Sequence, residues 1–259
     1  MRKVEAYNEF ARVYDTFMED TPYDKWVNFI DECMKKYNVT PNIVCDLGCG
    51  TGKMTSIFAR RGIEMIGIDN SEEMLMVARE NAYEDELNIL YLMQDMSQFE
   101  LYGTVDLIYS ACDCMNYLVE EKDVLSTLKW VNNYLEPEGL FIFDINTPYK
   151  YKEVLGNRVF AQQEASSAYI WENYYDEEEG INEYEVSFFI QDEEDGRYDR
   201  AVENHYQRAY SIERMKELIS EAGLELIGVY DEYSFEPVRE DSQRATFVAR
   251  EKGKRKEIK

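Results

Sequence analysis

Short apolar runs alternate with amphipathic stretches through residue 148. Residues 51–61, 71–82 and 124–135 space their apolar side chains three or four positions apart, which predicts helices. The runs between these helices read as strands buried on both faces, at 43–47, 64–69, 88–94, 104–109 and 140–145. This βα order predicts an α/β fold with a parallel sheet, helices on both faces, and a ligand crevice at the carboxyl ends of the strands.

The two ends of the chain extend this pattern. Residues 5–38 are predicted to be helical, with an interruption at 20–22. Ser211 is expected to cap a helix that Gly223 ends, and residues 224–230 and 244–249 read as the last two strands.

The pattern changes after Pro148. Residues 168–175, 182–191 and 197–210 are rich in aromatic and β-branched side chains and are separated by acidic, glycine-ending turns. They predict a small antiparallel sheet. Residues 149–210 are therefore interpreted as an insert that roofs the crevice of a domain formed by 1–148 and 211–250, followed by a basic, solvated tail at 251–259.

Alternation along two strands of the insert predicts which sides are packed. One apolar set occupies alternate positions of the middle strand and another those of the third strand: Tyr184, Val186, Phe188 and Ile190, and Tyr198, Val202, Tyr206 and Tyr210. Glu203, His205 and Gln207 fall on the other side of the third strand. We expect the apolar sides to pack, which would leave these polar side chains free to face the crevice.

A glycine-rich turn follows the first strand. A dinucleotide-binding fingerprint would need a small residue where Lys53 stands, and a phosphate-binding P-loop would need glycine at Leu47 and a hydroxyl at Met54. Both patterns fail. What remains is Asp-x-Gly-x-Gly-x-Gly over 46–52, with Asp69 placed 21 residues after Gly48, a spacing that can deliver a carboxylate to a ribose.

These features resemble the first two motifs of the class I S-adenosylmethionine-dependent methyltransferases, over residues 40–147. The resemblance implies a Rossmann-like, seven-stranded, mostly parallel sheet with an antiparallel last strand, and S-adenosylmethionine as cofactor. Residues 204–211 resemble the lid-to-helix junction of a bacterial subgroup with an inserted antiparallel sheet and small-molecule acceptors. The cofactor-binding residues that the resemblance implies are Tyr14, Asp46, Gly48, Cys49, Gly50, Gly52, Asp69, Asn70, Met74, Asp95, Met96 and Ser110.

Charge and cysteine content limit the classes of binding partner that we expect. With 53 acidic and 28 basic residues the net charge is −25, which disfavours nucleic acids and anionic membranes. Solubility alone could also explain this charge. The five cysteines form neither a disulfide framework nor paired metal-binding spacings, so no metal is expected. With no leader and no long apolar run in the sequence, we expect a cytoplasmic protein.

The acceptor side is less defined by the sequence. Methyl transfer from a sulfonium needs mainly alignment, so a base is optional, and His205 and Tyr117 are the candidates for one. The alternative for His205 is a solvent-exposed or merely hydrogen-bonded side chain with no role in catalysis. Two other functions stay open, a non-catalytic S-adenosylmethionine-binding regulator and an NAD-dependent oxidoreductase. The sequence predicts neither the acceptor, nor N- against O-methylation, nor the oligomeric state.

Overall fold

The computed structural model describes residues 15, 18, 21–192 and 195–254. Tyr14 and most of the helix predicted before residue 20 lie outside these residues. The first five elements in chain order are the two strands that flank the glycine-rich turn and the three helices around them: α2 (Tyr23–Lys36), β1 (Ile43–Leu47), α3 (Lys53–Ala59), β2 (Glu64–Asp69) and α4 (Glu72–Glu84). The remaining parallel strands of the first sheet and the helical segments between them follow: β3 (Ile89–Met93), η1 (Met96–Gln98), β4 (Val105–Ser110), η2 (Cys114–Tyr117), α5 (Glu121–Tyr134) and β5 (Leu135–Asn146).

A second group of elements follows β5. It consists of the π-helical segment η3 (Lys150–Leu155), β6 (Val159–Gln163), β7 (Ser167–Asp176), β8 (Ile181–Gln191) and β9 (Tyr198–Arg208). The chain then returns to the first sheet through α6 (Ile212–Glu221), β10 (Glu225–Asp231) and β11 (Arg244–Arg250). Among the described residues no helix is both long and apolar enough to cross a bilayer.

The first sheet has seven strands in the order β10-β11-β5-β4-β1-β2-β3, and β11 runs antiparallel to both of its neighbours. The predicted Rossmann-like, mostly parallel sheet is therefore confirmed. Its strands are buried on both faces because alternate side chains of one strand enter two different cores. In β5, Phe141 and Phe143 pack with α5 and α6, whereas Leu140 and Ile142 pack with α2 and α3.

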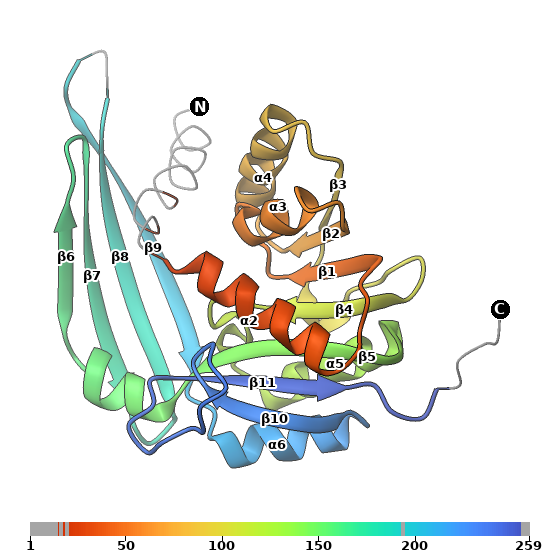
Figure 1. Cartoon of the computed structure of the whole chain (residues 1–259). Coiled ribbons are helices and arrows are strands. Elements are labelled where there is room, and N and C mark those ends of the chain that lie inside the picture. The colour runs from red at the N-terminus through yellow and green to blue at the C-terminus, as the bar shows by residue number, and fades with distance from the viewer. Residues whose placement is uncertain (1–14, 16–17, 19–20, 193–194, 255–259) are drawn as a thin grey trace.

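The second sheet is antiparallel, in the order β6-β7-β8-β9, and lies beside the first (Figure 1). Three of its strands were predicted from their aromatic and β-branched content and the turns between them, but β6 was not. Four of the five β6 side chains are exposed, so this edge strand carries no apolar pattern that would reveal it. The π-helical segment η3 was likewise missed.

Glu203, His205 and Gln207 of β9 face the crevice as expected, but the predicted packing of the opposite side of β9 is wrong for Tyr198 and Tyr206. Tyr184 pairs with His205 and Val186 with Glu203, so these four side chains share one face of the sheet. On the opposite face Tyr198 and Tyr206 are about half exposed, whereas Tyr210, which follows the end of β9, is buried as predicted. The polar side of β9 thus faces the same space as the apolar side of β8.

The expectation of a solvated tail is wrong for Glu251, while residues 252–254 are exposed as expected. Glu251 is buried, and Lys254 Nζ donates to the backbone carbonyls of Asn132, Asn133 and Leu135 at 2.6–2.8 Å. These carbonyls lie at the end of α5, where a helix leaves acceptors unpaired and favours a cation. The start of the tail therefore caps α5.

Candidate functional site

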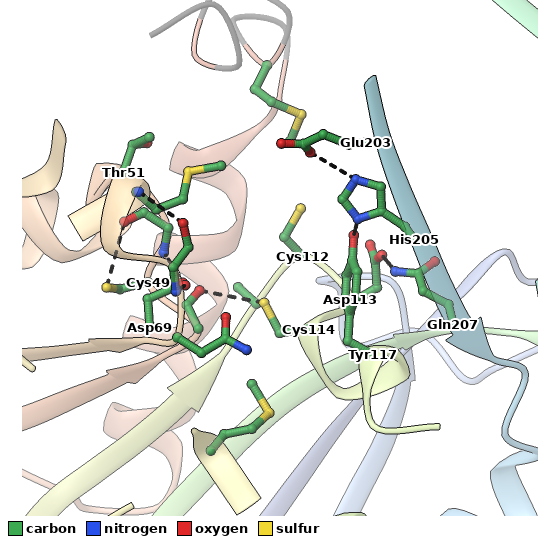
Figure 2. Close-up of a pocket in the computed structure, with 18 of the residues that line it drawn as sticks. Cys49, Thr51, Asp69, Cys112, Asp113, Cys114, Tyr117, Glu203, His205 and Gln207 are labelled. Carbon is green, nitrogen blue, oxygen red and sulfur yellow. Dashed lines mark hydrogen bonds and ion pairs between the residues drawn. The ribbon is translucent and has the colours of Figure 1, made fainter. Parts of the chain in front are cut away.

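A cavity of about 1110 Å³ lies where the carboxyl ends of β1, β2 and β4 meet the second sheet. Figure 2 shows Cys49, Thr51 and Asp69 on one wall and Glu203, His205 and Gln207 on the other, with Cys112, Asp113, Cys114 and Tyr117 between them. The predicted crevice at the strand ends is present, and the second sheet forms its far side.

The three alternate glycines of the loop after β1 have different surroundings. All three have positive φ, between 53° and 89°. A Cβ at Gly48 would lie 2.7 Å from Cys114 Sγ, and one at Gly52 would lie 2.3 Å from the Tyr91 hydroxyl. A Cβ at Gly50 would meet nothing within 4 Å. The outer glycines are thus required by packing within the protein, while Gly50 borders open cavity.

Asp69, the last residue of β2, is fixed against this loop. Its Oδ2 accepts from the Gly50 N–H at 2.8 Å, and its Oδ1 accepts from the Ser71 N–H at 2.9 Å. Burial raises the pKa of Asp69, although these backbone donors oppose the rise. A carboxylate has about four acceptor positions, so each oxygen can still accept a hydroxyl of a ligand in the cavity.

Asp46 lies beneath the loop and is 3% exposed. Its Oδ2 accepts from Thr55 Oγ1 at 2.6 Å and from the Tyr109 hydroxyl at 2.8 Å. Burial raises the pKa of Asp46 to about 7, and the two hydroxyl donors partly offset this effect. This side chain therefore connects β1 to α3 and β4 as well as lining the cavity.

The other predicted cofactor residues divide into two groups. Cys49, Asn70, Met74, Asp95 and Met96 line the cavity. The side chain of Asp95 also caps η1 by accepting from the Ser97 N–H at 2.7 Å. Gly52 and Ser110 are not among the lining residues, and the Ser110 hydroxyl is buried with no hydrogen-bond partner among the described residues.

One described residue of the N-terminal segment contacts the loop. Asp15 accepts from Thr51 Oγ1 at 2.6 Å and forms an ion pair with Lys53 at 2.9 Å. Tyr14, predicted to contact the cofactor, lies outside the described residues.

An ionic network not predicted from the sequence supports the floor of the cavity. Arg244 on β11 contacts Asp113 at 2.7 Å and also Asp144, a fully buried residue of β5 that accepts from Tyr233 and from the Asp113 N–H. Cys112 and Asp113 are consecutive non-glycine residues with positive φ, at 63° and 51°. Strain of this kind persists where the surrounding structure enforces it, and here the network holds the turn after β4.

The sole histidine lies on the far wall. His205 Nε2 is 3.0 Å from Glu203 Oε2, and Nδ1 is 3.3 Å from the Tyr117 hydroxyl. Because a carboxylate only accepts, Nε2 carries a proton, and in the neutral imidazole Nδ1 accepts from Tyr117. The ring stacks on Tyr184 with centroids 4.7 Å apart. The structure thus brings together both residues that the sequence offered as candidate bases.

Comparison with known proteins identifies the family. A family model described as a methyltransferase domain matches residues 44–139. A candidate methyltransferase of Geobacillus sp. (strain WCH70) is 32% identical over 95% of this chain and 99% of its own length. The candidate methyltransferase YqeM of Bacillus subtilis (strain 168) is 34% identical over 94% of this chain and 96% of its own. The chain belongs to the methyltransferase family.

A solved structure agrees with this methyltransferase assignment. The S-adenosylmethionine-dependent methyltransferase from Clostridium acetobutylicum ATCC 824 has a TM-score of 0.87 and 32% identity, covering 96% of this chain and all of that one. S-Adenosylmethionine is therefore the cofactor of this enzyme, and neither the regulatory nor the dehydrogenase hypothesis is favoured. None of these protein names specifies a methyl acceptor.

The residues of the methyltransferase cavity fit this cofactor. Gly50 leaves room beside the loop, and Asp69 is held with acceptor capacity toward the cavity. The cofactor carries a sulfonium charge, which suits walls with more acidic than basic side chains. Among the described residues no three histidine, cysteine, aspartate or glutamate side chains form a metal-binding group.

Proposed function

We propose that this methyltransferase transfers a methyl group to a nitrogen or oxygen atom of a small molecule bound against the second sheet. The observation that carries the proposal is one continuous cavity with two unlike walls. The glycine loop and Asp69 form the wall suited to the cofactor, and aromatic side chains of β7 and β8 with the polar side of β9 form the other. A cavity of about 1110 Å³ has room for a nucleoside-sized cofactor and one further small molecule.

In this proposal the cofactor is held by residues of the first sheet. The glycine loop approaches its methionine end, Asp69 accepts from its ribose hydroxyls, and Asp95 with Met96 lies at its adenine. The remaining contacts come from Gly48, Cys49, Gly50, Asn70 and Met74. Gly52 acts through packing, as its contact with Tyr91 indicates.

We assign residues 149–210 to acceptor binding, as an insert in a cofactor-binding domain formed by 1–148 and 211–250. Bound S-adenosylmethionine supplies a methyl group on a positively charged sulfur, which is already a good leaving group. The protein's task is to hold the acceptor atom about 3 Å from that carbon and in line with its bond to sulfur. The Arg244 network keeps the floor between the two ligands rigid. The net charge of −25 disfavours a nucleic acid as the acceptor.

Two measurements test the proposal. Calorimetry should show S-adenosylhomocysteine binding to the purified protein, and cofactor with a radioactive methyl group should label a small-molecule fraction of a cell extract. Label that enters only protein or nucleic acid would contradict a small-molecule acceptor. Absence of S-adenosylhomocysteine binding would contradict the assignment of the glycine loop and Asp69 to cofactor binding.

A further inference from the structure

The charges that line the cavity are unbalanced. Seven acidic residues line it against three basic ones: Asp46, Asp69, Glu73, Asp95, Asp113, Asp123 and Glu203, against Lys53, Lys150 and Arg244. The basic side chains are already engaged within the protein. Lys53 pairs with Asp15, Arg244 with Asp113 and Asp144, and the Lys150 ammonium donates to the Asn146 side chain at 2.9 Å.

Glu203 differs from the carboxylates at the cavity floor. It is 20% exposed, and its ion-pair partner is His205, which is charged only when protonated. It faces the cavity together with Tyr184 on the neighbouring strand, and the Trp171 ring contacts the edge of Tyr184 at 5.5 Å. A carboxylate among aromatic rings attracts a cation, because both the charge and the ring faces stabilise it.

The hydrogen bonds around His205 form a chain that leads from Tyr117 through the imidazole to Glu203. Nε2–H donates to Glu203, Nδ1 accepts from Tyr117, and the Tyr117 hydroxyl also contacts the Tyr184 hydroxyl. Burial raises the pKa of Tyr184 well above its ordinary value, so that phenol stays neutral. Tyr117 is 42% exposed in the cavity wall and hydrogen-bonded to the imidazole, so its hydroxyl can relay a proton between the cavity and His205.

Resting on the proposed function, we infer that the acceptor is an amine that binds as an ammonium ion beside Glu203 and gives up its proton to His205 through Tyr117. A phenol is a weaker fit, because its phenolate would be repelled by Glu203. An aliphatic alcohol is also a weaker fit, because its hydroxyl is far less acidic than an ammonium group.

Atoms and charges balance in this sequence of steps. The ammonium N–H breaks, its proton passes to the Tyr117 oxygen, and the Tyr117 proton passes to His205 Nδ1. The resulting imidazolium is paired with Glu203. The free nitrogen lone pair then forms the N–C bond as the methyl C–S bond breaks, and the bonding electrons remain on sulfur. The imidazolium afterwards releases its proton to water.

A matched pair of probes tests the cation site without knowledge of the acceptor. Choline and 3,3-dimethylbutan-1-ol have nearly the same shape but differ by one positive charge. Calorimetry on protein saturated with S-adenosylhomocysteine should show choline binding at least about 10-fold more tightly. Glu203→Gln should reduce the ratio to less than about threefold, whereas Glu185→Gln, which removes one charge from the other face of the sheet, should not.

The single imidazole provides a second readout. His205 is the only histidine, so its proton resonance is unambiguous, and choline should shift it in wild type and in Glu185→Gln. Equal binding of the two probes, binding of neither, or an unmoved resonance would overturn the inference. S-Adenosylhomocysteine binding, measured first, separates these outcomes from failure of the proposed function.

Discussion

The backbone N–H of Gly50 donates a 2.8 Å hydrogen bond to Asp69 Oδ2. The middle glycine of the loop and the carboxylate at the end of β2 are therefore fixed to each other across two parallel strands. This hydrogen bond links the position expected to contact the cofactor's methionine part to the carboxylate expected to contact its ribose.

Asp69→Ala should weaken S-adenosylhomocysteine binding by about 1–3 kcal/mol, because the ribose hydroxyls lose their acceptor and the loop loses its anchor. Calorimetry measures the change. Asp241→Ala, which removes an exposed carboxylate, serves as the control and should bind normally. Unchanged affinity in Asp69→Ala would refute the assignment of Asp69 to the ribose.

Gly50→Ala and Gly52→Ala should affect different properties, cofactor binding at position 50 and stability at position 52. Both positions have positive φ, which costs an alanine about 1–2 kcal/mol. The new methyl group at 50 would occupy open cavity, so we expect weaker cofactor binding with little further loss of stability. At 52 it would collide with Tyr91, so the free energy of unfolding should fall by about 1–3 kcal/mol more. Urea unfolding and calorimetry together distinguish the two, and identical profiles would contradict this division.

Asp46 should make stability depend on pH. Burial raises its pKa from 3.8 to about 7 in the folded protein, so between these values the folded state holds a proton that the unfolded state has lost. Stability from this group therefore falls as pH rises from about 4 to about 7. Asp46→Asn cannot ionise and removes this effect.

Urea unfolding at pH 5 and pH 8 measures the effect of Asp46. The free energy of unfolding of the asparagine variant minus that of wild type should be larger at pH 8 than at pH 5. The increase should be on the order of a few kcal/mol. Titrating groups that do not interact with Asp46 are the same in both proteins and cancel in the comparison. A difference between the two proteins that does not change with pH would show that Asp46 titrates normally.

Arg244→Gln should lower the free energy of unfolding by about 3–5 kcal/mol, because it leaves the fully buried carboxylate of Asp144 without its cation. Arg239→Gln is the matched control. Arg239 is 61% exposed and pairs with Asp231 and Asp241, so its loss should cost less than about 1 kcal/mol. Similar losses in thermal or urea unfolding would contradict the importance of the buried network.

Most of the fold could be predicted from local sequence patterns. The predicted strand at 64–69 matches β2, and Ser71 caps α4 by accepting from the Met74 N–H as expected. The glycine loop and Asp69 could be recognised because their spacing is set within one strand-helix-strand unit. The Arg244–Asp113 pair joins residues 131 positions apart, and no local pattern encodes such a contact.

The second sheet shows a different limit. Alternation along β9 correctly separates Glu203 and His205 from Tyr206, because successive side chains point to opposite faces. It does not say which face is covered. That choice depends on β8, whose Val186 and Phe188 lie on the cavity side and bring the polar face of β9 with them.

The orientation of β9 has a consequence for folding. A slip of one residue against β8 would turn Val202 and Tyr206 toward the side that now holds Glu203 and His205. It would also bring Arg200 and Asn204 to that side, so side-chain hydrophobicity alone does not fix the register. Two contacts favour the observed register: Gln207 donates to Asp113 at 2.7 Å, and Asn116 donates to the Arg208 carbonyl at 2.8 Å. The turn after β4 and the helical segment η2 thus select the register that gives the cavity its polar wall.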